Sequence, residues 1–119
     1  MKIAVASSGR NLEAPVDSRF GRAAGFIVYD TDTDEFTVAD NKQNLNAAQG
    51  AGIQSARNVA ATGAEVVLAA NFGPKAFTVL QTAGIKMFLC SVSTVEEEIE
   101  DYLKGRLSEA VSANVAGHW

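Results

Sequence analysis

The 119-residue chain has very few residues of the kind that bind metals directly, with one cysteine, Cys90, and one histidine, His118. A single cysteine excludes an internal disulfide and is typical of a reducing compartment, so we expect a cytoplasmic protein. One cysteine and one histidine cannot supply the about four ligands of a structural zinc or iron–sulfur site. A Ser–His–Asp catalytic arrangement would have to use the penultimate residue, His118, and is poorly supported.

Long apolar runs and an excess of positive charge are also missing. No stretch approaches the ~20 apolar residues that span a bilayer, and the apolar start of the chain is too short for a signal peptide. The net charge of −4 argues against a surface that coats nucleic acid or an anionic membrane. The first apolar run, residues 2–6, has no carboxylate of the kind that a two-metal nuclease needs. We therefore expect a protein that is not an enzyme and that binds neither nucleic acid nor membranes.

The composition is that of an ordinary globular domain, with 47% apolar and 20% charged residues. We expect one domain, residues 1–119, that buries roughly 65% of its unfolded surface. Its charge is uneven, because residues 1–26 carry a balance of +2 and the remainder carries −6. In the stretch DSRFGRAAGF, residues 17–26, two arginines flank Phe20-Gly21. Such a loop is either a solvated segment with an anchoring phenylalanine or a site for an anion.

Hydrophobic patterning predicts an alternation of strands and helices. Short apolar runs predict strands at 2–6, 26–30, 36–40, 65–70 and 85–90, and helical spacing predicts helices at 50–62, 74–84 and 94–105. The first three strands can pair as a meander, and the later strand–helix units require parallel strands. The simplest assembly is one mixed five-stranded sheet with helices against its faces. Residues 41–49 are predicted to form a polar loop, and Thr94 with Glu97 fits a capping box. The acidic residues 96–101 are explained by helix capping and a solvated face, and the tail from Arg106 is weakly patterned.

Ligands of open parallel sheets bind beyond the carboxyl ends of the strands. The loops at 7–25, 71–74 and 90–93 should meet there, with the N-termini of the helices that begin near Pro74 and Thr94 pointing at the same edge. Four cations would add full positive charges to this edge, namely Arg10, Arg19, Arg22 and Lys75. The pattern predicts an anion site at this edge, although loop arginines can also be merely solvated.

Several stretches together resemble a known family in their order and spacing. They are MKIAVAS at the start, PVDSRFGRA at 15–23, NFGP at 71–74, GIK at 84–86, TVEEEIEDYLKGRL at 94–107 and ANVAGHW at the end. The chain is similar over nearly its whole length to the dinitrogenase iron–molybdenum cofactor biosynthesis family. The resemblance implies that family's ribonuclease H-like fold, a three-layer α/β domain with strand order 3-2-1-4-5 and an antiparallel second strand.

The resemblance also implies a function. Some small members of the family carry metal–sulfur cofactors or their precursors, which implies non-enzymatic carriage of an anionic molybdenum-containing sulfide cluster for cofactor assembly or storage. The chain looks most like stand-alone members from anaerobic sulfate reducers, so a molybdenum–copper cluster is favoured over an iron–molybdenum precursor. We expect a monomer, with protein partners for cluster delivery. The alternative is a cofactor-free adaptor or regulator of the same fold.

Arginine forks and backbone N–H groups can hold such a cluster through its sulfides. The candidate cofactor-binding residues are Arg10, Ser18, Arg19, Phe20, Gly21, Arg22, Asn71, Phe72, Gly73, Lys75 and Ser91. Some family members use histidine or cysteine as ligands, so His118 and Cys90 are the candidate metal ligands. Cys90 can also be an inert core residue and His118 part of a mobile tail. We expect Trp119 to pack on the protein or on the cluster and to bring His118 within reach of the site.

Overall fold

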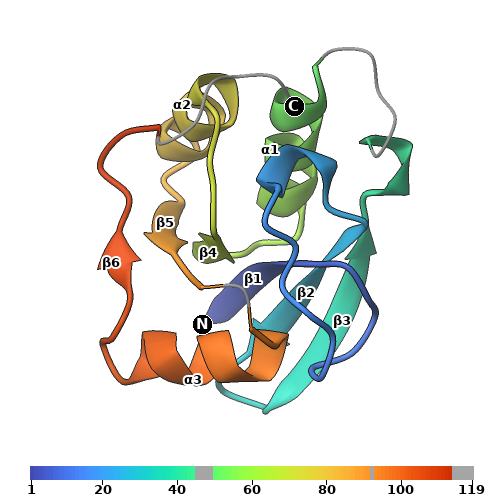
Figure 1. Cartoon of the computed structure of the whole chain (residues 1–119), viewed down its shortest axis with the longest axis vertical. Helices are drawn as coiled ribbons and strands as arrows, with labels where there is room; N and C mark the ends of the chain where they lie inside the picture. The colour runs from blue at the N-terminus through green and yellow to red at the C-terminus, as the bar shows by residue number, and fades with distance from the viewer. Residues whose placement is uncertain (45–49, 92, 114–119) are drawn as a thin grey trace.

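In the described part of the chain, six strands form one mixed sheet in the order β3-β2-β1-β4-β5-β6 (Figure 1). The computed structural model describes residues 1–44, 50–91 and 93–113. The strands are β1 (Lys2–Ser7), β2 (Gly25–Asp30), β3 (Glu35–Asp40), β4 (Val66–Ala69), β5 (Lys86–Leu89) and β6 (Ser108–Glu109). The helices are α1 (Ala51–Ala61), α2 (Pro74–Thr82) and α3 (Val95–Leu103), with 3-10 turns η1 (Phe20–Arg22) and η2 (Lys42–Asn44).

The strand directions confirm the α/β fold predicted from the sequence. β1 pairs in parallel with β4, and β4 with β5, whereas β2 is antiparallel to both β1 and β3. The prediction of five strands is corrected to six, because Ser108–Glu109 adds the short antiparallel strand β6 beside β5. A strand of two residues has no periodicity of its own and is defined by its partner, so the sequence pattern missed it.

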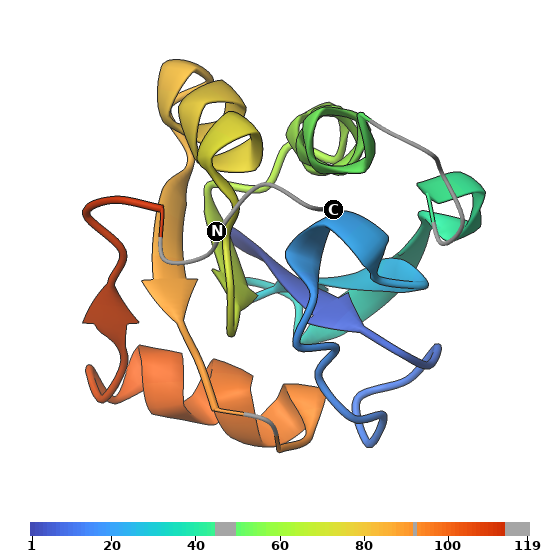
Figure 2. The same cartoon turned by 45° about the horizontal axis from the view of Figure 1, so that its top comes forward.

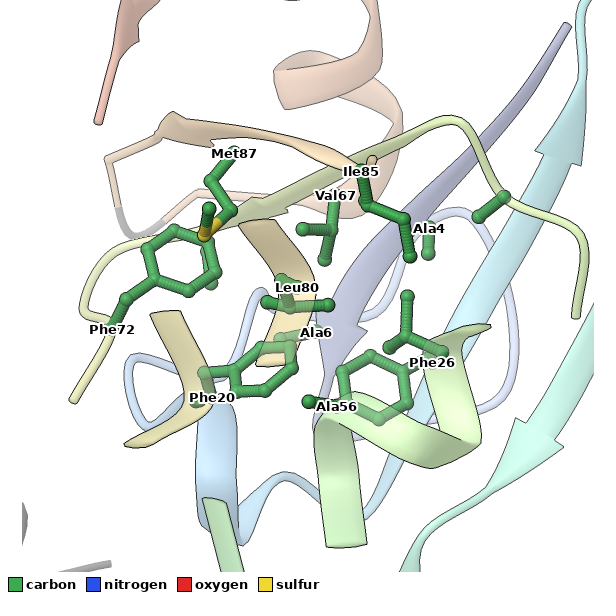
Figure 3. Close-up of a cluster of buried hydrophobic side chains, with 14 of the residues drawn as sticks. Ala4, Ala6, Phe20, Phe26, Ala56, Val67, Phe72, Leu80, Ile85 and Met87 are labelled. Carbon is green, nitrogen blue, oxygen red and sulfur yellow. The ribbon is translucent and has the colours of Figure 1, made fainter. Parts of the chain in front are cut away.

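The helices cover the sheet in three layers (Figure 2). α1 and α2 lie on one face, where their side chains join the core around Phe20, Phe26 and Phe72 (Figure 3). α3 lies on the other face and buries Val95 and Ile99 against the sheet. Within the described part of the chain, no helix is long and apolar enough to cross a membrane.

The caps of α3 show how the sequence fixes a helix locally. The Thr94 hydroxyl accepts the Glu97 N–H at 3.2 Å, and the Glu97 carboxylate accepts the Thr94 N–H at 3.3 Å, which confirms the predicted capping box. Gly105 follows the helix with a φ of 73°, a left-handed conformation that glycine adopts without steric cost. These signals lie within a few residues of one another and were readable from the sequence.

One edge of the sheet collects the loops that matter for function. β1, β4 and β5 are parallel, and β3 runs in the same direction because both β1 and β3 are antiparallel to β2. The segments that follow these four strands therefore leave from the same edge, and α1, α2 and α3 each begin after one of them.

Candidate functional site

The Ser-Arg-Phe-Gly-Arg stretch packs directly against the Asn-Phe-Gly-Pro turn. The Asn71 side-chain amide donates to the Ser18 carbonyl oxygen at 2.9 Å, and the ring centroids of Phe20 and Phe72 are 5.3 Å apart. Phe20 also lies 5.3 Å from the ring of Phe26 on β2 (Figure 3). The predicted meeting of these two loops is therefore present. Phe20 and Phe72 are fully buried, so they position the loops rather than offer a surface to a ligand.

A buried hydrogen-bond network fixes the backbone of η1. The Asn41 side-chain amide donates to the Ala23 carbonyl and to the Ser55 hydroxyl, both at 2.9 Å. The Ser55 hydroxyl in turn donates to the Gly21 carbonyl at 2.9 Å. Asn41 and Ser55 are fully buried, so these bonds satisfy groups that water cannot reach. Gly21 is thus held in place by α1 and by the residue after β3.

The same network extends to Arg22. The Asn41 side-chain oxygen accepts from the amides of Asn44 at 2.8 Å and Asn58 at 2.7 Å. Arg22 donates from Nη1 to the Asn44 carbonyl at 3.2 Å, so its guanidinium lies beside η2. The sequence analysis named Gly21 and Arg22 of this network but missed Ser55 and the asparagines that bind them. The available signal was the asparagine-rich stretch that follows β3, which was interpreted only as a polar loop.

The predicted cations divide into two groups. Arg19 pairs with the Asp17 carboxylate at 3.5 Å, so part of its charge is neutralised beside η1. Lys75 is exposed in the first turn of α2. Arg10 is exposed in the part of the loop that runs toward α3, because the Leu12 carbonyl two residues later accepts the Glu96 N–H at 2.8 Å. The structure therefore gathers Arg19, Arg22 and Lys75 on the α1–α2 side, whereas Arg10 belongs to the α3 side.

The N-termini of α1 and α2 are open. Their N-cap residues are Gly50 and Gly73, which have no side chain to accept an N–H group. The first N–H groups that bond within the two helices are those of Gln54 and Phe77. The N–H groups that precede them have no acceptor inside their own helix. No described residue accepts a hydrogen bond from those N–H groups, which are on Ala51, Gly52 and Ile53 of α1 and on Lys75 and Ala76 of α2.

A groove connects these two helix starts. It has a volume of about 340 Å³ and is lined by Ile53 of α1 and by Pro74, Lys75, Thr78 and Val79 of α2. We name this the α1–α2 groove. It combines apolar walls, one ammonium group and the positive ends of two helix dipoles, which together suit an anion.

The N-terminus of α3 is closed. The Val95 N–H donates to the Ala14 carbonyl at 2.9 Å and the Glu96 N–H to the Leu12 carbonyl at 2.8 Å. The Glu97 N–H is taken by the Thr94 cap. The N–H groups that the sequence analysis expected to face an anion at this helix are therefore already paired with the chain itself.

Ser91 and Cys90 lie near a buried carboxylate rather than near the cations. The Glu98 side chain accepts from the Ser91 N–H at 2.9 Å, from the Ser91 hydroxyl at 3.0 Å and from the Ser93 hydroxyl at 2.6 Å. Glu98 is 1% exposed, which corrects its interpretation as part of a solvated helix face. Its burial depends on residues of another segment, so helical periodicity gave no signal for it.

The Cys90 thiol is poorly suited to bind metal. Its side chain packs with Val95 and Ile99 on the α3 face of the sheet, opposite to Phe20 and Phe72. Burial, together with the charge of Glu98, raises the pKa of the thiol to about 12. Since the thiolate is the metal-binding form, a thiol that stays protonated at neutral pH is a weak ligand.

His118 and Trp119, the other expected contributors, lie outside the described residues. Among the residues that are described, no three His, Cys, Asp or Glu side chains come together as a metal-binding group. The described groups that could bind an anion at the α1–α2 groove are therefore N–H groups and cations.

Comparisons with known proteins connect the chain to a family and to solved structures. The model of the family described as dinitrogenase iron-molybdenum cofactor matches residues 1–105. The apo form of the orange protein from Desulfovibrio gigas is 41% identical, covers 96% of each chain and superposes with a TM-score of 0.92. A NifB-like protein of Thermotoga is 34% identical over 98% of each chain, with a TM-score of 0.85. An uncharacterized protein of Methanocaldococcus jannaschii is 28% identical over 92% of this chain and 91% of its own length.

Proposed function

The chain belongs to the dinitrogenase iron–molybdenum cofactor family, and from this premise we propose that it binds and carries a molybdenum-containing metal–sulfide cluster without transforming it. Family membership supports a role connected with such clusters. The similarity to the orange protein supports carriage, because that structure is described as an apo form, a form that lacks a bound group. The cluster is cargo here, and the carrier is a monomer that works in the cytoplasm and passes it to a protein partner.

The proposed binding site of the cluster is the α1–α2 groove. Metal–sulfide clusters are anions with soft, weakly hydrated surfaces, which suit apolar walls and N–H donors better than a fully solvated site. Ile53 and Val79 supply apolar wall, and the open first turns of α1 and α2 supply N–H donors. Lys75 supplies a full positive charge at the groove. The observation that carries the proposal is that two uncapped helix N-termini border one groove in a member of this family.

The donor set favours one kind of cluster. Iron–sulfur clusters are normally held by cysteine thiolates on their irons. The single cysteine of this chain is buried on the other face of the sheet and keeps its proton at neutral pH. A molybdenum–copper cluster whose metals are saturated by its own sulfides needs no protein thiolate, so we favour it over an iron–molybdenum precursor.

Reconstitution of the apo-protein tests this function. The full chain is titrated with tetrathiomolybdate and Cu(I), and visible absorption and metal content are measured after gel filtration. We expect a coloured complex with the parent protein and a loss of retained metal with Lys75→Glu. Lys86→Glu, an equivalent change at the exposed first residue of β5, is the matched control and should retain metal.

Two outcomes would contradict the proposal in different ways. A folded parent protein that retains neither molybdenum nor copper would rule out carriage and favour the cofactor-free adaptor. A Lys75→Glu protein that retains as much metal as the parent would be consistent with cluster carriage but would show that the cluster does not bind in the α1–α2 groove.

A further inference from the structure

A second groove lies on the opposite face of the sheet, between α3 and the hairpin formed by β2 and β3. Its volume is about 290 Å³. In Figure 2, α1 and α2 lie side by side on one face of the sheet, whereas α3 is the only one of the described helices on the other face. We name it the α3–hairpin groove.

The floor of the α3–hairpin groove is apolar. Leu12, Tyr29, Ile99 and Leu103 line it. Leu103 is 56% exposed although it is a large aliphatic residue at the end of α3. Beside the floor, Tyr29 pairs in register with Phe36 of β3, which is 37% exposed. Apolar surface that is grouped in a groove, rather than scattered, is typical of a binding surface.

The rim of this groove is acidic. Asp34, Glu96 and Glu100 line it, and none of the described lining residues is a lysine or an arginine. Glu100 pairs with Lys104 at 2.7 Å and also interacts with the charge of Arg106, and both side chains of the Glu100–Lys104 pair are well exposed. A surface pair of this kind is weak and can exchange its partner. The groove therefore has an apolar floor with carboxylates on its edge.

Asp34, in the turn between β2 and β3, has a left-handed backbone conformation. Its φ is 59°, the left-handed conformation that hairpin turns usually assign to glycine or asparagine. Its carboxylate accepts a hydrogen bond from the Tyr29 hydroxyl, which fixes both groups at the mouth of the groove. The Asp34 carboxylate therefore lies on the rim beside the Tyr29 hydroxyl.

We propose that the α3–hairpin groove docks a basic, amphipathic segment of a partner protein. The segment would insert an apolar side chain between Tyr29 and Leu103 and would place lysine or arginine beside the three rim carboxylates. Charge complementarity favours a basic occupant, because a second copy that docked through the same groove would bring the rim carboxylates of both copies together. The groove lies on the sheet face opposite to α1 and α2, so a partner can dock without covering the α1–α2 groove. This inference does not depend on which cargo the protein carries.

Titration of the isotopically labelled apo-protein with a synthetic peptide tests the inference. The probe is a short amphipathic helix with a leucine stripe flanked by lysines, and its counterpart has glutamates in place of the lysines. We expect the lysine peptide to shift the NMR signals of Leu12, Tyr29, Ile99 and Leu103, and the glutamate peptide to shift none. Raising the salt concentration should weaken the complex.

Two variants separate binding from folding. Leu103→Glu should weaken the lysine peptide by about tenfold or more, because it removes a central apolar contact. Asp34→Gly removes a rim carboxylate without backbone strain and should weaken the peptide while the protein stays fully folded. Val111→Glu, at another exposed apolar residue, is the control and should leave binding unchanged.

Other results would overturn the inference. Peptide-induced shifts confined to other surfaces, or equal binding of the lysine and glutamate peptides, would show that the groove does not select a basic segment. A parent protein that dimerises, and becomes monomeric with Leu103→Glu, would assign the groove to a second copy of the chain instead.

Discussion

Asn71 and Ser18, 53 residues apart in the sequence, are joined by a hydrogen bond of 2.9 Å from the Asn71 side-chain amide to the Ser18 carbonyl oxygen. This bond connects the segment after β4 with the loop after β1, next to the packed rings of Phe20 and Phe72. It sets the position of η1 relative to the first turn of α2, and the α1–α2 groove depends on that turn.

Asn71→Ala should loosen this connection. Loss of one partly buried hydrogen bond costs about 1 kcal/mol of unfolding free energy, which lowers the melting temperature by about 4 °C. If the loop positions the cargo site, the variant should also release a reconstituted cluster faster than the parent. Gln81→Ala, an exposed change on α2, is the control. A variant with parent stability and parent release would show that the bond is incidental.

The two arginines of the motif should differ in their effect on cluster retention. Arg19 pairs with the Asp17 carboxylate, which offsets part of its charge, and the Arg22 guanidinium is fixed beside η2 by its bond to the Asn44 carbonyl. We expect Arg22→Glu to lower the affinity for a thiomolybdate–copper cluster by about tenfold, and Arg19→Glu to lower it less. The double variant should abolish retention. Metal analysis after gel filtration measures the cluster retained by each variant, with Lys86→Glu as the control.

A reversed order would show that the assignment of these two arginines is wrong. Parent-like retention by the double variant would exclude the whole loop from the site. Circular dichroism on each variant verifies that a loss of metal does not reflect unfolding.

The sequence could predict features that depend on neighbouring residues, and it missed those that depend on distant ones. The Thr94–Glu97 capping box and the positions of five strands along the chain follow from local patterns, and the structure confirms both. The order of these five strands in the sheet was implied by the family resemblance, and the structure has the same order. β6 was missed because two residues become a strand only by pairing with β5. The burial of Asn41 and Glu98 was missed for a similar reason, because each is satisfied by groups that other segments bring to it.

The same distinction applies to the candidate site. Loop order predicted that the motifs around Phe20 and Phe72 would meet, since both follow parallel strands. It could not predict that the chain's own carbonyls would close the start of α3 while α1 and α2 stay open. That difference arises from how the long loop after β1 folds over α3, which is a matter of tertiary packing.

Cys90 should make the stability of the folded protein depend on pH in alkaline solution. The pKa of its thiol is about 12 in the folded chain against an ordinary value of 9.0. Below pH 9 the thiol is protonated in both states, so it gives no pH dependence. Between about pH 9 and pH 12 only the unfolded chain releases the proton, so stability falls by at most about 1.4 kcal/mol per pH unit.

Cys90→Ala isolates this effect from the tyrosines and lysines that also titrate at high pH. Denaturant unfolding of both proteins from pH 8 to pH 11 should show a shallower decline for the variant. Cys90→Ser should also keep most of the capacity for a reconstituted cluster, because one protonated thiol cannot saturate a multinuclear cluster. Identical pH slopes would refute the buried-thiol account, and a folded but colourless Cys90→Ser protein would make the cluster thiolate-anchored.

Glu98→Gln should change both stability and thiol reactivity. The Glu98 carboxylate accepts three hydrogen bonds from Ser91 and Ser93. An amide in its place keeps one acceptor oxygen, so the Ser91 and Ser93 hydroxyls would have to turn from donors into acceptors, and the charge that strengthens these bonds is lost. The resulting mismatch in a site that is 1% exposed should cost about 2 kcal/mol of unfolding free energy. The negative charge of Glu98 also raises the pKa of the Cys90 thiol, so its removal should lower that pKa and speed alkylation by iodoacetamide at alkaline pH.

Glu100→Gln, at an exposed residue of the same helix, should change neither quantity. Alkylation is measured under conditions in which almost all of the protein is folded. A faster reaction then reflects a more reactive thiol rather than unfolding. A Glu98→Gln protein with parent stability and parent alkylation rate would mean that the carboxylate neither ties the β5–α3 connection nor acts on the thiol.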